Sequence, residues 1–455
     1  MRPGRFGSRC EGRARDKIGV STMNRNVYIV GAVRTPIGKF GGALAEFTAP
    51  DLGVIAVRAA LQRAFGLPLP PERAPGEGPQ IDLARVLGAG VVPDLPWRVN
   101  ELIFGNARPA GLGPNPARQI AWRAGLGDDV PAFTINMACA SGLRSVMLGW
   151  QQIVAGDAEI IVAGGAESMS RVPYLVEARW GFRMGNQPLI DSMYRDGFLC
   201  QISKMVMGDT AEVLASKYQI SRDEQDNFAL ESHRRAARAS SAGDFQAEIV
   251  AIEHTDKKGK VTRIASDEHI RPDVTLEALA KLPPVFAPAG NTAATVTAGS
   301  SSGITDGAAA IVLVSEEILR SLKLTPLARI VDATVAGVDP RVMGIGPVPA
   351  VRKLMHRTAT GIADYAAVEL NEAFSAQVLA CDRELHFDRA RLNPNGGAIA
   401  LGHPIACSGA RILATLVHHL RRPNGPKEVG NKVNRGLATL CVSGGFGVAM
   451  EIEAF

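Results

Sequence analysis

The strongest constraint in this sequence is a short segment that occurs twice. Ala140–Arg144 is Ala-Ser-Gly-Leu-Arg, and Cys407–Arg411, 267 residues later, is Cys-Ser-Gly-Ala-Arg. Each copy stands where a predicted helix begins, and each is followed by a strand that ends in Gly-Gly, at Val162–Gly165 and at Val442–Gly445. This shared order of turn, helix and strand predicts that one α/β unit has been duplicated. Two such halves packed side by side would bring their corresponding helix starts together, so a site between them would draw residues from both.

Strand and helix patterns alternate from Asn26 onward, with one long interruption. We therefore expect an N-terminal half made of residues 26–163 and 289–325, a loop or cap domain at 164–288, and a C-terminal half at 326–455. The Pro- and Gly-rich segment 66–95 is typical of a surface insertion. Residues 1–25 are rich in arginine, and we expect them to be a disordered basic extension.

Composition excludes several classes of function. The 455 residues carry 50 Lys and Arg against 45 Asp and Glu, a net charge of +5, of which residues 1–22 hold +4. The rest of the chain is nearly neutral, which excludes a basic body for nucleic acid. No apolar run reaches the roughly 18 residues that a membrane span needs. The six cysteines form no CxxC pair and no Cys/His cluster, so we expect reduced thiols and no metal site. We expect the cytoplasm, or an organellar matrix if the extension is a presequence.

Cys139 is the first candidate for chemistry. It lies in Asn136–Gly142, after a short predicted strand and directly before a predicted helix. The partial positive charge of a helix start lowers the pKa of a thiol, and the small neighbours Ala138 and Ala140 leave room for a substrate. The alternative is a buried structural cysteine, because free Cys is among the most buried residue types.

Three further residues are candidate partners. His403 lies in the Gly- and Asn-rich segment Asn393–Pro404, a loop whose backbone can approach a ligand, although an isolated His is more often structural. Cys441 ends an apolar strand ahead of Ser443-Gly444-Gly445, where backbone N–H groups can face an oxyanion. Asn371 follows a predicted strand, and its alternative role is a plain helix N-cap.

Together these segments resemble the thiolases, which are coenzyme A-dependent acyltransferases. The segments are Asn136–Gly142, Asn371–Phe374, Asn395–Arg411 and Cys441–Gly447, and the resemblance extends from about Asn26 to Glu453. It implies an α/β fold with duplicated βαβαβαββ halves in a five-layer α-β-α-β-α arrangement and an inserted loop domain, which agrees with the repeat. It also implies cleavage of 3-ketoacyl-CoA to acyl-CoA and acetyl-CoA by ping-pong transfer through a thioester.

The resemblance also implies a role for each candidate. Cys139 would be the nucleophile, His403 its base, and Cys441 the second acid/base at the acetyl carbon. One oxyanion hole would be His403 with a water held by Asn371, and the other the backbone N–H groups of Cys139 and Ser443. Coenzyme A contacts carry over to Phe198, Met207, Arg271, Ser302 and Phe374, with no permanently bound cofactor; an ordinary surface arginine is the alternative for Arg271.

Departures from the family pattern bear on the substrate. Val206 stands where acetoacetyl-selective thiolases often carry a histidine, which favours a broader or longer β-ketoacyl substrate over a strictly four-carbon one. Ser443 replaces a usual glycine, and Ala406 and Cys407 replace a usual Gly-Ala. Ser300 and Thr305 stand where asparagines are common.

Two other functions are compatible with parts of this sequence. The chain could be an inactive CoA-binding paralogue or scaffold in a fatty-acid oxidation assembly, which retention of all four candidate groups disfavours. A decarboxylating ketoacyl synthase needs a histidine where Asn371 stands and has no use for Cys441. We expect CoA and acyl-CoA as partners, a homodimer or homotetramer, possible association with β-oxidation enzymes, no nucleic acid and no membrane span.

Overall fold

The structure, a computed structural model, describes residues 25–66, 69–76, 97–255, 258–286, 293–422 and 434–455. The predicted basic extension, apart from Arg25, and most of the predicted insertion at 66–95 lie outside these residues. No helix of the described residues is long and apolar enough to cross a membrane.

The strands fall into two groups with the same internal order. One group runs β1-β10-β5-β3-β4 and the other β11-β14-β13-β12. In the first group β3 pairs in parallel with β4. At the corresponding edge of the second group, Val368 of β12 forms a parallel bridge with Leu392. The strands are β1 (Val27–Arg34), β3 (Glu101–Gly105), β4 (Ala132–Ile135), β5 (Ile160–Ser168), β10 (Thr305–Ser315), β11 (Ala328–Gly337), β12 (Ala367–Leu370), β13 (Asn434–Val442) and β14 (Phe446–Ala454). The matching order confirms the duplication that the repeated segment predicts.

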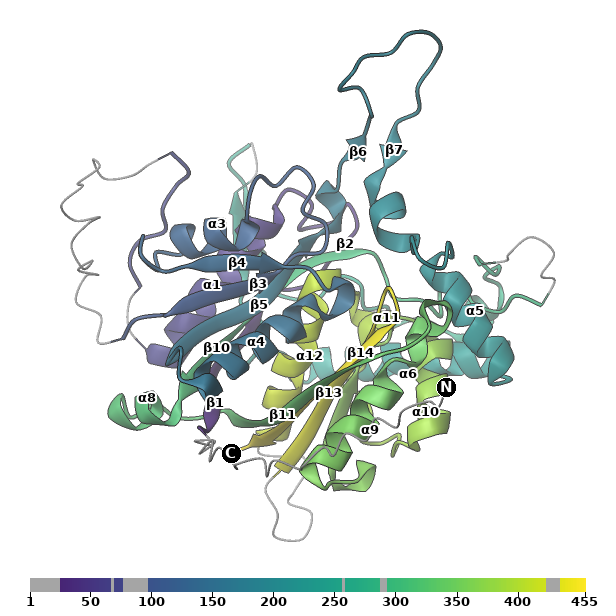
Figure 1. Cartoon of the computed structure of the whole chain (residues 1–455). Helices are drawn as coiled ribbons and strands as arrows, with labels where there is room; N and C mark the ends of the chain where they lie inside the picture. Colours follow the sequence, from purple (N-terminus) through teal and green to yellow (C-terminus); the bar gives the residue numbers. More distant parts are fainter. Residues whose placement is uncertain (1–24, 67–68, 77–96, 256–257, 287–292, 423–433) are drawn as a thin grey trace, which may run out of the picture.

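Helices cover both strand groups and fill the space between them (Figure 1). The helices are α1 (Ala49–Phe65) and α3 (Pro116–Arg123) on the first group, α9 (Pro347–Thr358) and α10 (Ser375–Leu385) on the second, and α4 (Ser141–Ala155) and α12 (Ile405–Leu420) between the groups. An antiparallel pairing of β1 with β11 joins the two groups into one ten-stranded sheet, whose tenth strand, the short β2 (Gly38–Lys39), pairs with β10 off the main path. The helices and the two strand groups therefore form five layers, α-β-α-β-α, as the family resemblance implies.

The two glycines of the repeat explain why α4 and α12 can touch. A Cβ at Gly142 would lie 2.7 Å from the carbonyl oxygen of Ala406, and a Cβ at Gly409 would lie 2.5 Å from the amide nitrogen of Leu143. Each helix therefore needs glycine where the backbone of the other approaches. The close contact places the two helix starts, with Cys139 ahead of one and His403 ahead of the other, in the middle layer.

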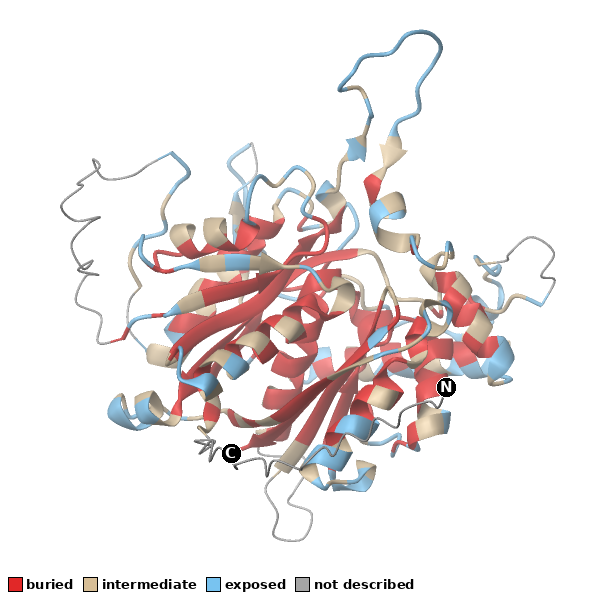
Figure 2. Cartoon of the chain, viewed as in Figure 1, coloured by how far each residue is buried: buried red, intermediate tan, exposed pale blue. Residues whose placement is uncertain are grey.

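The segment between β5 and β10 carries elements outside the layers. They are β6 (Tyr174–Leu175), β7 (Ile190–Asp191), the π-helical turn Tyr194–Phe198, α5 (Met207–Lys217), α6 (Arg222–Ser241), β8 (Ile252–Thr255), β9 (Val261–Ile264) and α7 (Leu276–Ala280). The hairpin of β6 and β7 projects away from the body (Figure 1). Figure 2 shows that its loop is exposed, whereas the central strands and α12 are buried.

Candidate active site

The backbone ahead of α4 holds Cys139 in an unusual conformation. Ala138 has a φ of +44°, in the left-handed region that a non-glycine residue rarely adopts. Ser141 fixes this turn, because its Oγ accepts from the Met137 amide at 2.9 Å and donates to the Ala138 carbonyl at 2.7 Å. Strain maintained by specific hydrogen bonds is typical of a functional loop.

Cys139 packs against apolar side chains from both halves. Its neighbours belong to a cluster of Ala107, Met169, Met193, Phe198, Ile304, Ile405 and Ala406. The backbone N–H groups of Ser443 and of Cys139 itself lie within hydrogen-bonding reach of the sulfur. These are the two donors that the sequence assigned to an oxyanion hole, and the fold places both at this sulfur.

The pKa of Cys139 differs from the sequence-based expectation. Burial raises the pKa of this thiol, and the Ser443 amide and the charge of Arg108 oppose that rise without cancelling it. The expected lowering by the helix start is therefore wrong. The prediction considered the helix start alone, whereas the folded chain surrounds the sulfur with apolar groups that disfavour the thiolate.

His403 is held in one tautomer. Its Nδ1 lies 2.6 Å from the Ser408 Oγ, and the Ser408 hydroxyl donates its hydrogen to the Pro404 carbonyl at 3.0 Å. Nδ1 must therefore carry the proton that Ser408 accepts, which leaves Nε2 as a free lone pair. Nε2 is buried and has no hydrogen-bond partner. Burial, together with the cations of Arg411 and Arg108, lowers the pKa of His403 to about 3, so the ring is neutral near pH 7.

Cys441 lies at the end of β13, beside the first cysteine. It packs in a buried cluster with Met343 and Phe374. Burial raises the pKa of Cys441 well above its ordinary value, and the neighbouring Cys139 and Cys381 raise it further. Cys441 is therefore a protonated thiol in the resting site, as a proton donor must be.

Asn371 does not cap a helix. The helix that follows it, α10, begins at Ser375, and its N-cap is Phe374, with no side-chain cap, so the N-cap alternative for Asn371 does not hold. The Asn371 amide donates to the Thr439 carbonyl on β13 at 3.1 Å, and its side-chain Oδ1 accepts from Arg411 at 3.5 Å. Its Nδ2 is buried without a partner. Like His403 Nε2, it is a polar atom left available for a ligand or a water.

Glu167 is a buried carboxylate that the sequence alone did not single out. It accepts from the backbone amides of Ala107, Arg108 and Ala406, each at 3.1 Å, and from Asn106 Nδ2. Burial raises its pKa to about 7 despite these donors and the charge of Arg108. Glu167 joins the loop after β3 to the start of α12, and no local sequence pattern marks that long-range connection.

The predicted coenzyme A contacts divide into two sets. Phe198 lies in the cluster around Cys139, and Met207 and Phe374 lie in the cluster around Cys441. The Ser302 amide donates to the carbonyl of Ala373 at 3.0 Å, which places Ser302 beside this second set. Arg271 is exposed, and its backbone amide donates to His233 Nδ1 at 3.2 Å, so the structure does not bring it into either cluster.

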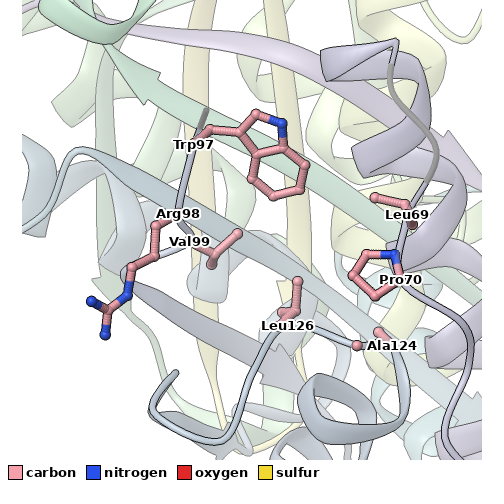
Figure 3. Close-up of a pocket in the computed structure, with 8 residues that line it drawn as sticks. Leu69, Pro70, Trp97, Arg98, Val99, Ala124 and Leu126 are labelled. Atoms are coloured by element: carbon pink, nitrogen blue, oxygen red, sulfur yellow. The ribbon is translucent and has the colours of Figure 1, made fainter. Parts of the chain in front are cut away.

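A crevice at the amino end of β3 is too small to be a substrate-binding site. Figure 3 shows its lining, which includes Leu69, Pro70, Trp97, Val99 and Leu126. Its volume of about 10 Å³ holds at most a water. It lies at the amino end of β3, whereas the Glu167-bound loop of the site follows the carboxyl end of that strand.

Comparisons with known proteins decide the family. The model described as "Thiolase, N-terminal domain" matches residues 27–72 and 83–317, and "Thiolase, C-terminal domain" matches residues 324–454. The chain belongs to the thiolase family. An acetyl-CoA acetyltransferase of Escherichia coli strain K12 is 45% identical over 431 residues, covering 94% of this chain and 99% of the relative.

Solved thiolase-family structures have the same fold. An acetyl-CoA acetyltransferase of Bacillus anthracis superposes with a TM-score of 0.84 at 40% identity, covering 96% of this chain and all of that one. Human mitochondrial 3-ketoacyl-CoA thiolase in complex with CoA superposes with a TM-score of 0.82 at 39% identity, covering 95% and 99%. This chain is accordingly an acyltransferase with the thiolase fold.

Proposed function

We propose that this thiolase cleaves 3-ketoacyl-CoA reversibly to acyl-CoA and acetyl-CoA, by ping-pong transfer of the acyl group through a Cys139 thioester. The observation that carries the proposal is a sulfur with two backbone N–H groups directed at it, at a helix junction that also presents the free Nε2 of His403. The printed names of the relatives, acetyl-CoA acetyltransferase and 3-ketoacyl-CoA thiolase, support the same reaction.

In the first half-reaction Cys139 gives its proton to His403 Nε2 and attacks the C3 carbonyl of the substrate. The resting pair is neutral, because burial raises the pKa of Cys139 and lowers that of His403. Proton transfer therefore accompanies attack rather than preceding it. The oxygen that becomes negative accepts from the N–H groups of Cys139 and Ser443. Cleavage of the C2–C3 bond leaves the acyl group on Cys139 and an acetyl-CoA enolate.

The enolate then needs a proton and a stabilised oxygen. Cys441 gives its thiol proton to the enolate carbon and becomes a thiolate, which releases acetyl-CoA. His403, now protonated at Nε2, and a water held by Asn371 Nδ2 donate to the enolate oxygen while its charge persists. Both atoms lack a protein partner in the structure, which leaves them free for this task.

The second half-reaction returns every group to its starting state. CoA gives its thiol proton to Cys441, and its sulfur attacks the acyl carbonyl on Cys139. The Cys139 thiolate leaves and recovers its proton from His403, so acyl-CoA is released and no net proton is consumed. Phe198, Met207, Ser302 and Phe374 line the approach to the two cysteines in this proposal, and Arg271 meets the nucleotide end of CoA.

Self-association belongs to the same proposal. The β6–β7 hairpin exposes large apolar side chains, with Trp180 95% and Met184 91% accessible. Such a surface is typical of a protein contact, and it supports a homodimer or homotetramer. A Trp180→Asp variant should lower the mass measured by light scattering. We also propose that the enzyme works in the cytoplasm, where reducing conditions keep Cys139 and Cys441 as thiols. We further propose that it associates with other fatty-acid oxidation enzymes.

Acyl-enzyme trapping tests the central step. Incubation with acetyl-CoA carrying a labelled acetyl group should transfer the label to the peptide that contains Cys139, in the wild type and in Cys441→Ala. CoA binding without any labelled peptide would overturn the proposed thioester. A chain-length series of 3-ketoacyl-CoA thiolysis rates then tests the substrate, and we expect activity beyond four carbons because Val206 occupies the position before Met207.

A further inference from the structure

Arg411 is a buried cation to which the proposed chemistry gives no role. It lies on α12, the helix that follows His403, and its side chain is fully buried. Its Nη1 is 3.6 Å from a carboxyl oxygen of Glu369, and its Nη2 donates to Asn371 Oδ1 at 3.5 Å. Burying a cation is costly unless neighbouring groups interact with it. Of these two neighbours, Asn371 belongs to the proposed reaction, so Arg411 can act on catalysis through it.

The contact with Arg411 decides which way the Asn371 amide faces. A guanidinium carries five N–H donors and no acceptor, so it can bond only to the oxygen of a side-chain amide. With Oδ1 on Arg411, the amide nitrogen is directed elsewhere, where Nδ2 is buried without a protein partner. In the proposed reaction Nδ2 holds the water that donates to the enolate oxygen. An amide turned by 180° would direct its own oxygen to that place and add negative partial charge beside a developing oxyanion.

The backbone and the side chain of Asn371 are fixed by different elements. Its backbone amide donates to the Thr439 carbonyl on β13 at 3.1 Å. In the part of the chain that the structure describes, Arg411 is the only hydrogen-bond partner of the Asn371 side chain. Strand β13 therefore sets where the residue lies, and Arg411 sets how its amide is turned.

The second proposed oxyanion donor also lies within the field of Arg411. Burial lowers the pKa of His403, and the charges of Arg411 and Arg108 lower it further, with Arg411 the stronger of the two. The same guanidinium thus contacts Asn371 and acts through space on His403. Nε2 of His403 and Nδ2 of Asn371, both buried without a protein partner, are therefore arranged around one cation.

We propose that Arg411 is a positioning residue of this active site, which turns the Asn371 amide so that Nδ2, and the water it holds, face the enolate oxygen. The inference rests on the proposed thiolase function. Arg411 itself touches no reacting atom and acts through Asn371. The first copy of the repeat supplies a matched residue, because Arg144 stands three positions after Ser141 as Arg411 stands three after Ser408. Arg144 is only partly buried.

A double-mutant cycle tests whether Arg411 acts through Asn371. Thiolysis is measured at pH 8, where His403 is neutral, with the 3-ketoacyl-CoA that the wild type cleaves fastest. Arg411→Met should lower kcat roughly 10- to 100-fold with KM nearly unchanged, because a misplaced donor weakens binding of the transition state. In the Asn371→Ala background the same change should have no further effect on kcat. Arg144→Met should keep the wild-type kcat.

Two further variants separate positioning from folding. Arg411→Met leaves the carboxyl group of Glu369 buried without its partner, so Arg411→Met is also made in a Glu369→Gln chain and compared with Glu369→Gln alone. The same loss of kcat is expected there. Arg411→Lys should recover part of it, because an ammonium group also only donates but lacks the planar fork.

The outcomes distinguish this inference from the proposed function. Losses of kcat that add in the Arg411→Met, Asn371→Ala double variant would overturn the inference, because the two residues would then act independently. A wild-type kcat in Arg411→Met would overturn it as well. A wild type that cleaves no 3-ketoacyl-CoA would instead overturn the proposed function.

Discussion

The two copies of the repeated segment enter their helices alike but carry different chemistry. In the first copy Cys139 stands two positions before Ser141, and in the second copy Ala406 stands two positions before Ser408. The second copy has its own cysteine one position later, Cys407, which is fully buried with a pKa raised by burial to about 12. A duplicated backbone thus presents a usable thiol in one half and an inert one in the other, because one position decides whether the sulfur faces the pocket or the core.

The serines of the two copies show the same divergence. Ser141 fixes the backbone around Cys139, whereas Ser408 fixes the proton on His403. The arginines differ too. Arg411 is fully buried beside Glu369 and Asn371, while Arg144 is only partly buried. The two copies therefore share one backbone arrangement, but the first positions Cys139 and the second positions His403 for the proposed reaction.

The largest expected effect comes from removing the thiol of the first copy. Cys139→Ala should lower kcat for thiolysis by a factor on the order of 10⁴ or more, because no acyl-enzyme can form. Cys407→Ala, the matched change in the second copy, should keep wild-type kcat. Steady-state thiolysis rates measure both. Comparable activity in the two variants would contradict the assignment of Cys139.

The glycines at the helix crossing should respond alike in both copies. Gly142→Ala and Gly409→Ala each place a methyl group less than 3.0 Å from the backbone of the other helix. Each should lower the free energy of unfolding by about 3 kcal/mol or more, since backbone cannot rotate away as a side chain can. Gly361→Ala is the control, because its Cβ would meet only Asp364 at 3.7 Å. Urea denaturation compares the three, and a stable Gly409→Ala would show that the helices can separate.

Ser408→Ala should affect the proposed base rather than stability. Without the Ser408 oxygen, Nδ1 loses its acceptor and the imidazole is free to place its proton on Nε2. We expect kcat to fall by roughly 10- to 100-fold. Ser141→Ala serves as the comparison, because it changes the turn at Ala138 without contacting His403. Deuterium exchange and pH–rate profiles distinguish the Ser408→Ala variant from the Ser141→Ala variant, because only Ser408→Ala should alter the ionisation attributed to His403.

The smallest expected effect concerns Glu369, beside Arg411 in the second copy. Burial raises its pKa to about 8, against an ordinary value of 4.5. A carboxyl whose folded pKa is raised contributes stability when protonated, and that contribution is lost as pH rises from 4.5 through about 8. Glu369→Gln should therefore flatten the decline of Tm between pH 5 and 9. An unchanged pH dependence would show that Arg411 keeps Glu369 ionised throughout.

The sequence predicted the halves, the middle-layer helix starts and the candidate residues, but not their ionisation. The repeat of Ser-Gly and Gly-Gly was a reliable guide because glycine is required where backbones approach closely, and this requirement fixes the residue type within a short segment even though the other backbone is far away in the sequence. The pKa of Cys139 was predicted wrongly, and the N-cap alternative for Asn371 does not hold. Both depend on residues far along the chain: apolar groups around the sulfur, and a loop ahead of Ser375 in which Asn371 bonds to β13.

By itself, the sequence determined a duplicated α/β scaffold and the identity of the groups that we propose to react, because both are encoded in short segments with fixed order. Only the tertiary structure decided which atoms are free to act. The surroundings of the unpartnered Asn371 Nδ2 and the packing of Arg108 on Gly197 depend on contacts between segments tens of residues apart, whereas the His403 ring is oriented by Ser408, only five residues further along the chain. Burial and hydrogen bonding set proton positions, and both arise only when those segments pack together.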